Sequence, residues 1–186
     1  MSQFQMYLEL GFHHILDFDG RDHILFIIAM MCLYKLKDWK EILAIVTSFT
    51  VAHSLSLLLS VLNIVSVNGK LIELAIAVTI LFTCVENIFL KKLQGKRVLF
   101  SGIFGLVHGL GFSNYLKSLL GKSGDLFTPL LAFNIGVELG QLLLVVLLFI
   151  CMWMSYRFLK MNQQSFILIT SILIGIQSVY WVIERL

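Results

Sequence analysis

LFTPLLAFNIGVELGQLLLVVLLFICMWMSY (residues 126–156) is the stretch that decides the fold class. It is almost wholly apolar and contains no Lys or Arg. A membrane-spanning helix needs about 20 such residues, so this run is long enough to cross a bilayer at a tilt. Three polar residues interrupt it at i, i+4 and i+7, which places Asn134, Glu138 and Gln141 on one face of the predicted helix.

The composition of the whole chain agrees with a membrane protein. Of its 186 residues 59% are hydrophobic and 13% are charged, whereas soluble domains are about 45–50% apolar and about 25% charged. The lipid bilayer is therefore the expected partner of most of the surface. The net charge of +3 is small and does not indicate nucleic-acid binding.

Six apolar segments predict an all-α, polytopic bundle with about six transmembrane helices, forming one domain over residues 1–186. They cover residues 22–35, 42–65, 71–90, 98–116, 126–156 and 165–183. The first is short and is expected to recruit part of 13–21. Before it, Phe4–Leu16 is either an interfacial amphipathic helix or a short re-entrant segment. The sequence leaves both alternatives open.

The cations predict the orientation of the chain. Nine of the 14 lie between the first and second, third and fourth, or fifth and sixth segments: Lys35, Lys37, Lys40, Lys91, Lys92, Lys96, Arg97, Arg157 and Lys160. The opposite side has Arg21, Lys70, Lys117, Lys122 and Arg185. Because cytoplasmic loops carry the excess of Lys and Arg, both termini are expected outside.

Three ionisable residues from different segments are predicted near the middle of the bilayer. At about 1.5 Å per residue, His53 lies about 20 Å and His108 about 16 Å from the predicted cytoplasmic side, and Glu138 lies about 16 Å from the outer side. Imidazole and carboxylate groups at one depth predict a divalent-metal site, with nickel, cobalt or zinc as the candidate ion. The alternative is a hydrogen-bonded His–Glu network that only holds the helices together.

Further polar residues are predicted around this site. His14 and Asp17 are expected at its outer mouth, followed by Asp22 and His23 as metal ligands at the start of the first span. Neighbouring residues on a helix point about 100° apart, so Asp22 and His23 are not expected to chelate one ion simply by being adjacent. Ligand-orienting roles are predicted for Asn134, Gln141 and Ser54.

An ordered set of motifs resembles the HupE/UreJ family over nearly the whole chain. The motifs are GFHHIL…DHILF within Gly11–Phe26, AHSL from Ala52, FGLVHGLGF over Phe104–Phe112, AFNIGVELGQ over Ala132–Gln141, and Tyr180-Trp181 with Glu184-Arg185. The resemblance implies a small bacterial inner-membrane protein of the nickel or cobalt permease type, with Asp22, His23 and His108 as matching residues. A second copy of the chain is a candidate partner.

The motifs depart from the nickel-permease branch at two positions. Phe104 and Gly111 stand where that branch has a histidine and a glutamate, so the chain resembles a divergent branch in which His53 and Glu138 supply ligands. The leading hypothesis is a secondary transporter of a divalent transition metal. The alternative is an intramembrane zinc-dependent hydrolase that uses the same His/Glu site, with Glu138 or Asp22 as base.

Overall fold

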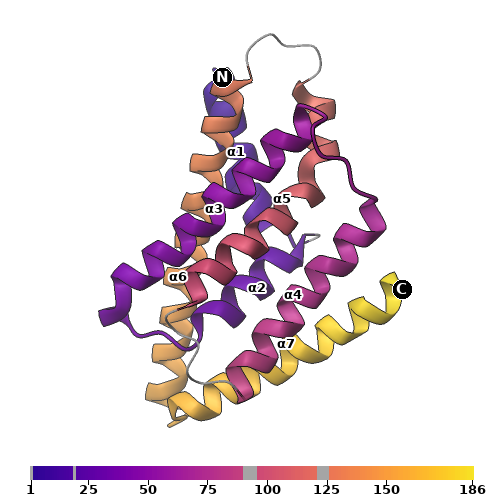
Figure 1. Ribbon diagram of the computed structural model, residues 1–186. Coiled ribbons are helices and arrows are strands. Elements are labelled where there is room, and N and C mark those ends of the chain that lie inside the picture. The colour runs from indigo at the N-terminus through magenta and orange to yellow at the C-terminus, as the bar shows by residue number, and fades with distance from the viewer. Residues whose placement is uncertain (1, 19, 90–95, 121–125) are drawn as a thin grey trace.

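The described chain is entirely helical, as the sequence predicts. The computed structural model describes all residues except 1, 19, 90–95 and 121–125 (Figure 1), so Lys91, Lys92 and Lys122 lie outside the described residues. No strand occurs in the described ranges. The elements are α1 (Gln3–Leu16), α2 (Arg21–Met31), the 3-10 helix η1 (Leu36–Asp38), α3 (Trp39–Val61), α4 (Gly69–Phe89), α5 (Arg97–Leu120), α6 (Phe127–Phe158) and α7 (Gln163–Arg185).

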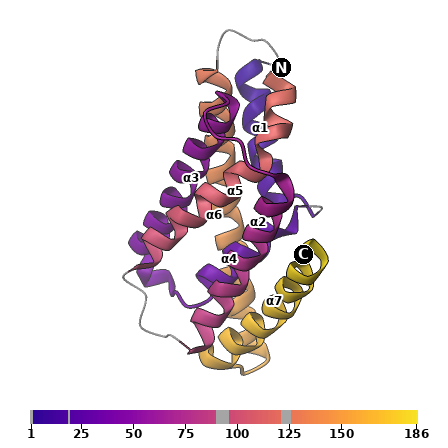
Figure 2. The same ribbon diagram turned by 45° about the vertical axis from the view of Figure 1, so that its right-hand side comes forward.

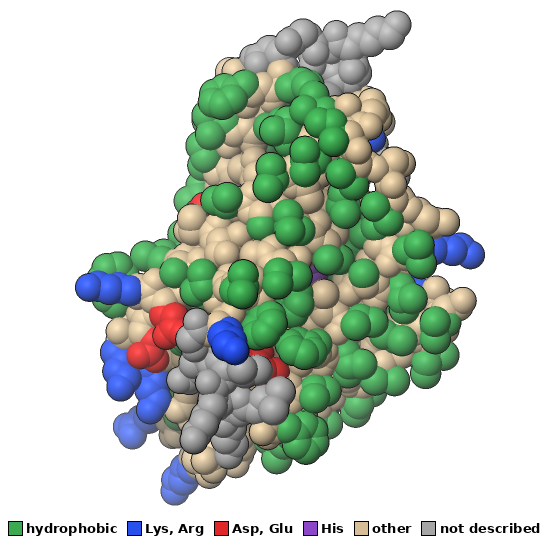
Figure 3. Space-filling view, in the orientation of Figure 1, with side chains coloured by type: hydrophobic (Ala, Val, Ile, Leu, Met, Phe, Trp, Pro, Cys, Tyr) green, Lys and Arg blue, Asp and Glu red, His purple; other side chains and the backbone are tan. Residues whose placement is uncertain are grey.

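Four of these helices are long and apolar enough to cross a membrane. They cover Leu36–Val61, Gly69–Phe89, Phe127–Phe158 and Gln163–Arg185, and a shorter apolar helix covers Arg97–Ser113. Apolar side chains are spread over the visible face, while basic side chains gather at the lower left (Figure 3). This pattern gives the molecule the character of a helical membrane protein, although six separate spanning helices are not seen.

The predicted first span differs from the observed structure. Helix α2 has 11 residues and rises only about 16 Å, which is too short to cross a bilayer core of about 30 Å. The chain breaks after α1, where Asp17 takes up an extended conformation, and α2 begins after Gly20. The expectation that the first span recruits part of 13–21 is therefore wrong, while the separate segment predicted over Phe4–Leu16 matches α1.

Glycines lie where pairs of helices approach each other most closely. Helices α3 and α5 run side by side in the same direction (Figure 1 and Figure 2), and a Cβ added at Gly105 or Gly109 would overlap the backbone carbonyl of Phe49 or His53. Such small residues let helix backbones approach closely in membranes. The α3–α5 contact therefore fixes the separation of the two helices that carry His53 and His108.

A second glycine contact places α1 inside the bundle. A Cβ at Gly11 would overlap the backbone of Phe133, and one at Gly136 would overlap the backbone of Leu8. Helix α1 thus lies lengthwise against α6, with Gly140 packed on Ile15 near its end. The end of α1 therefore packs inside the protein, where Gly11 and Ile15 are buried.

The remaining helices enclose α2. Helix α7 packs mainly on α4, where Ser178 Oγ donates to the carbonyl of Ala77. Helix α2 contacts α1, α4, α6 and α7. It buries six of its residues: His23, Phe26, Ile27, Ala29, Met30 and Met31. The short helix with Asp22 and His23 is therefore the central element of the fold.

Candidate metal site

Four histidines meet where α1 ends and α2 begins. His14 is in the last turn of α1, His23 in the first turn of α2, His53 on α3 and His108 on α5. One ligand atom from each of His14, His23 and His53 lies within 4.8 Å of the others. The His108 ring adjoins this group, with its centroid 5.1 Å from that of His23. Together these residues are called the histidine cluster.

Hydrogen bonds fix the tautomers of two of these rings. His108 Nδ1 lies 2.8 Å from the carbonyl oxygen of Phe104, and since a carbonyl only accepts, Nδ1 carries the proton. His23 Nδ1 lies 3.1 Å from Asp22 Oδ1 and donates in the same way. With the proton on Nδ1, the Nε2 atom of each ring is the nitrogen available to bind a metal ion. Metal-binding histidines in proteins typically have this arrangement.

The free nitrogens of the cluster have no hydrogen-bond partner. Among the described residues, the buried side-chain atoms without one include His14 Nε2, His23 Nε2, both ring nitrogens of His53 and His108 Nε2. Burying a polar group unpaired costs about 1–3 kcal/mol. Five such atoms at one point are costly for a purely structural network, and an ion bound by one nitrogen of each ring would satisfy four of them.

The spacing is close to what a metal ion requires. A tetrahedral site with metal–nitrogen distances of about 2.0–2.1 Å places its ligand nitrogens about 3.4 Å apart. The three closest histidines, within 4.8 Å, would have to draw together by about an ångström. Because His14 and His23 belong to separate short helices, small movements of α1 and α2 could supply this shift.

Aromatic rings form the walls around the cluster. Phe112 lies 4.0 Å from His14 between ring centroids, and Phe133 stacks on His53 at 6.3 Å. On the other side Phe49 and Phe26 contact His108 at 5.3 and 5.2 Å. An apolar shell excludes water and strengthens electrostatic interactions inside it. The site is therefore enclosed, with His53 0% and His108 1% exposed.

Two surface pockets adjoin the cluster beside the α1–α2 break. One, of about 350 Å³, is lined by Leu10, His13, His14, Asp17, Phe112 and Tyr115. The other, of about 270 Å³, shares His13 and Asp17 with it and adds Leu16 and Phe18. His14 lines the first pocket and also belongs to the cluster. It therefore connects the surface with the buried rings, while Asp17 remains at the mouth.

Glu138 is not brought together with the histidines. Its Oε1 accepts a hydrogen bond of 2.7 Å from Thr47 Oγ1, and Thr47 lies six residues before His53, about 9 Å along α3. The depth estimate placed Glu138 near the two histidines, but it did not specify which way the side chain points around α6.

The predicted ligand-orienting residues contact α3 or lie apart from the rings. Gln141 Oε1 accepts from Thr50 Oγ1 at 2.9 Å, and Ser54 Oγ donates to the carbonyl of Thr50 at 2.6 Å. Asn134 Oδ1 is buried without a partner. Gln141 thus joins α6 to α3, as Glu138 does through Thr47, whereas Ser54 bonds within α3. The group that directly orients a ring is Asp22, which also accepts from the backbone N–H of His23 at 2.9 Å.

The comparison with known families gives a match over nearly the entire chain. The model described as HupE / UreJ protein matches residues 1–185. The chain belongs to the HupE/UreJ family. No curated protein and no solved structure matched it.

His14 lines the surface pocket at the predicted mouth and also belongs to the histidine cluster. Sequence reasoning placed His14 at the mouth, whereas in this HupE/UreJ protein its Nε2 is buried with the other rings. The available signal was the pair Gly11 and Gly136, because small residues at matching positions predict close helix packing. Such packing would have drawn the end of α1 into the bundle.

Asp22→Asn tests the orienting carboxylate of this HupE/UreJ protein. The asparagine removes the negative charge that holds His23 Nδ1–H, and loss of such a partner typically lowers metal affinity about 10–100-fold. Nickel titration of the purified protein by calorimetry measures this change. Asp38→Asn is the matched control, because Asp38 accepts from the backbone N–H of Lys35, away from the cluster. Equal affinities for both variants would contradict the role of Asp22.

Proposed function

We propose that this HupE/UreJ protein is a permease for a divalent transition metal such as nickel or cobalt, with the histidine cluster as its intramembrane binding site. The observation that supports this most strongly is the set of five buried ring nitrogens that lack hydrogen-bond partners. Ionisable groups at bilayer depth are costly and commonly mark ion paths. Four imidazoles facing one point are suited to bind such an ion in passage.

The ligand set supports the class of ion. Imidazole suits nickel, cobalt, zinc and copper, whereas magnesium and calcium prefer sets of oxygen ligands. Among the described residues, the group of ligand atoms close enough to share an ion consists of histidines only. Asp22 bonds to His23 from the side, so its negative charge offsets part of the positive charge of the ion and of the α2 N-terminus.

The break between α1 and α2 supports a transport path. In many transporters, discontinuous helices place their ends at an ion site near the middle of the membrane. Here α1 and α2 would together make the first of six crossings, with the histidine cluster at their junction. The ion would enter at the pockets lined by His13, His14 and Asp17. The Lys and Arg pattern orients this side outward from the bacterial inner membrane.

An intramembrane zinc hydrolase is less well supported. A catalytic zinc site keeps a position for water, and the predicted mechanism needs a carboxylate base beside that water. Asp22 is hydrogen-bonded to His23, and Glu138 is hydrogen-bonded to Thr47. Neither carboxylate is placed to act as this base, whereas the pockets at His14 suit the entry of an ion.

Nickel uptake into proteoliposomes tests the proposal directly. The purified protein is expected to bind about one nickel or cobalt ion per chain and to carry it down a gradient, with saturation kinetics, because the cluster can hold a single ion. Liposomes with His23→Ala, which lacks the ring held by Asp22, are expected to show only background flux. Uptake that persists at the unmodified rate in His23→Ala liposomes would disprove the transport site.

A further inference from the structure

A second buried polar group lies at the opposite end of α2 from the histidine cluster. Arg97 of α5 is 0% exposed, and its Nη2 lies 3.1 Å from Glu86 Oε2 of α4. Arg97 Nε also donates to Glu86 Oε1 at 3.1 Å. Arg97 further donates to Asn87 Oδ1. Arg97 was predicted to be one of the loop cations, whereas in the structure its side chain is buried inside the bundle.

This group holds the end of α2. Arg97 Nη1 donates to the carbonyl of Met30 at 2.6 Å, and Asn87 Nδ2 donates to the carbonyl of Ala29 at 2.7 Å. Carbonyls at a helix C-terminus lack partners within the helix and carry partial negative charge. The cation and the amide therefore tie α2 to α4 and α5. The other end of α2 carries Asp22 and His23.

One layer of aromatic side chains lies between the histidine cluster and this group. On α2, His23, Phe26 and Met30 follow at i, i+3 and i+7, and so share one face. On α5, His108, Phe104 and Arg97 descend in the same order over about 16 Å. Phe26 contacts Phe104 at 5.7 Å and Phe49 at 5.3 Å between ring centroids. A phenylalanine layer thus separates the histidines from the buried ion pair.

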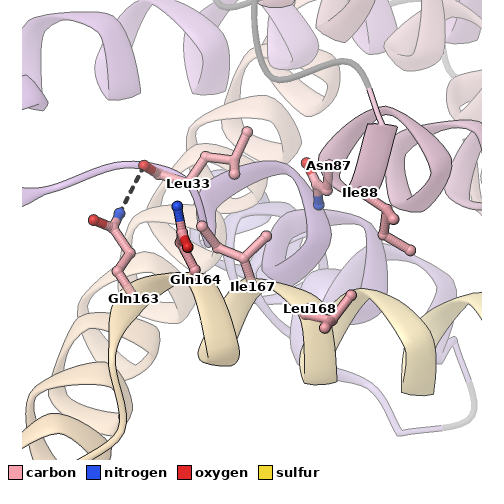
Figure 4. Close-up of a pocket in the computed structure, with 7 residues that line it drawn as sticks. All are labelled: Leu33, Asn87, Ile88, Gln163, Gln164, Ile167 and Leu168. Atoms are coloured by element: carbon pink, nitrogen blue, oxygen red, sulfur yellow. Dashed lines mark hydrogen bonds between the residues drawn. The ribbon is translucent and has the colours of Figure 1, made fainter.

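A pocket lies on the other side of Asn87. It has a volume of about 360 Å³ and is lined by Leu33, Asn87, Ile88, Gln163, Gln164, Ile167 and Leu168 (Figure 4). Gln163 reaches across it and donates to the carbonyl of Leu33 at 3.0 Å. Asn87 both lines this pocket and accepts from Arg97. The ion pair of Arg97 and Glu86 therefore lies between this pocket and the histidine cluster.

We propose that Arg97, Glu86 and Asn87 form the inner gate of the metal path, which opens when α2 moves away from α4 and α5. The inference rests on the proposed transport function. Stability alone is a weak reason for the pair, because a buried salt bridge is often no more stabilising than apolar residues of the same size. As a gate, the pair neutralises both charges while it is closed and releases α2, with His23, when it opens.

Cys32 provides a native reporter of opening. It follows α2, is 0% exposed, and accepts a hydrogen bond from Asn87 Nδ2 at 3.4 Å. In a background with Cys84→Ala and Cys151→Ala it is the sole thiol. Labelling of this protein by a water-soluble maleimide measures how often the gate is open, because a buried thiol reacts only from open states.

The parent protein for this experiment carries Cys84→Ala and Cys151→Ala. The rate of Cys32 labelling is measured in the parent and in its Arg97→Gln variant, each with and without saturating nickel. Nickel is expected to slow labelling of the parent about tenfold, because an ion held by His23 of α2 and His108 of α5 favours the closed state in which these helices are together. Arg97→Gln is expected to label rapidly with or without nickel while its nickel affinity stays within about threefold of the parent. Arg185→Gln is the matched control. It removes an arginine that pairs with Glu73 far from the gate, and it should label like the parent.

The outcomes separate the gate from the transport function. If calorimetry shows nickel binding but neither nickel nor Arg97→Gln changes Cys32 labelling, the gate is disproved and the metal site stands. If Arg97→Gln does not fold, the effect of nickel on Cys32 labelling of the parent alone decides whether the gate exists. Absence of nickel binding by the parent would overturn both proposals, and calorimetry reveals it before any labelling is done.

Discussion

Replacing His53 by leucine is expected to abolish nickel binding without destabilising the metal-free protein. Both His53 ring nitrogens are buried without partners, and each unpaired polar group costs about 1–3 kcal/mol. Leucine removes that cost and fills similar space. Loss of a direct ligand should weaken nickel by more than about 100-fold, since loss of an orienting partner alone costs about 10–100-fold. Thermal unfolding in detergent, with and without nickel, measures both effects.

His13→Leu is the matched control for this change. His13 lies on α1 next to His14 but is exposed, so the substitution should leave both nickel affinity and thermal stability close to the original values. A structural role for His53 gives the opposite pattern. If His53→Leu clearly lowers the unfolding temperature of the metal-free protein, the ring serves a hydrogen-bonded network and not a metal ion.

Gly109→Ala is expected to damage both stability and metal binding. The added Cβ would overlap the carbonyl oxygen of His53 and the hydroxyl of Ser56, so α3 and α5 must move apart. Overpacking of this kind costs about 1–3 kcal/mol, although alanine favours helices by about 0.5–1 kcal/mol over glycine. Separation of the two helices also moves His53 away from His108. The unfolding temperature and the nickel affinity should therefore fall together.

Gly69→Ala is the control for the helix effect. A Cβ at Gly69, the first residue of α4, meets nothing within 4 Å, so alanine should be neutral or slightly stabilising there. The contrast between the two variants isolates the close contact at Gly109. Unchanged unfolding and nickel affinity in Gly109→Ala would show that α3 and α5 can separate without cost and that their spacing does not set the site.

Hydropathy predicted much of the fold class, because apolar runs of about 20 residues are typical of membrane-spanning helices. The prediction of an all-helical membrane protein is confirmed, and so is the family indicated by the ordered motifs. The separate segment predicted over Phe4–Leu16 matches α1, but the expected extension of the first span into part of 13–21 is wrong, because the chain breaks there between α1 and α2. Hydropathy does not show where within 13–21 the first span stops.

Estimates of depth predicted some members of the histidine cluster better than others. His53 and His108 were placed at similar depths, and both rings lie beside His23 in the structure. Glu138 was placed at the same level but contacts Thr47. Depth gives only one coordinate of a side chain, and its direction around the helix depends on which helices are neighbours. Topology from charge counts does not supply that information.

Arg97 shows a similar limit of charge counting. A cation close to Lys96 and at the start of an apolar run has the sequence pattern of a loop residue. Its partner Glu86 lies 11 residues earlier, on α4. Only the packing of the two helices brings them together. A count of positive charges therefore predicts an orientation in the membrane, but it does not reveal that one of those charges is buried.

The interruption between α1 and α2 has a consequence for what the cargo does to its carrier. His14 and His23 lie on either side of the break, so an ion bound by both would close a loop of chain between them. A closed loop has fewer conformations available than an open one. The metal would then act as a removable crosslink: the loaded protein holds its first two helices as one unit, and release of the ion restores their independence.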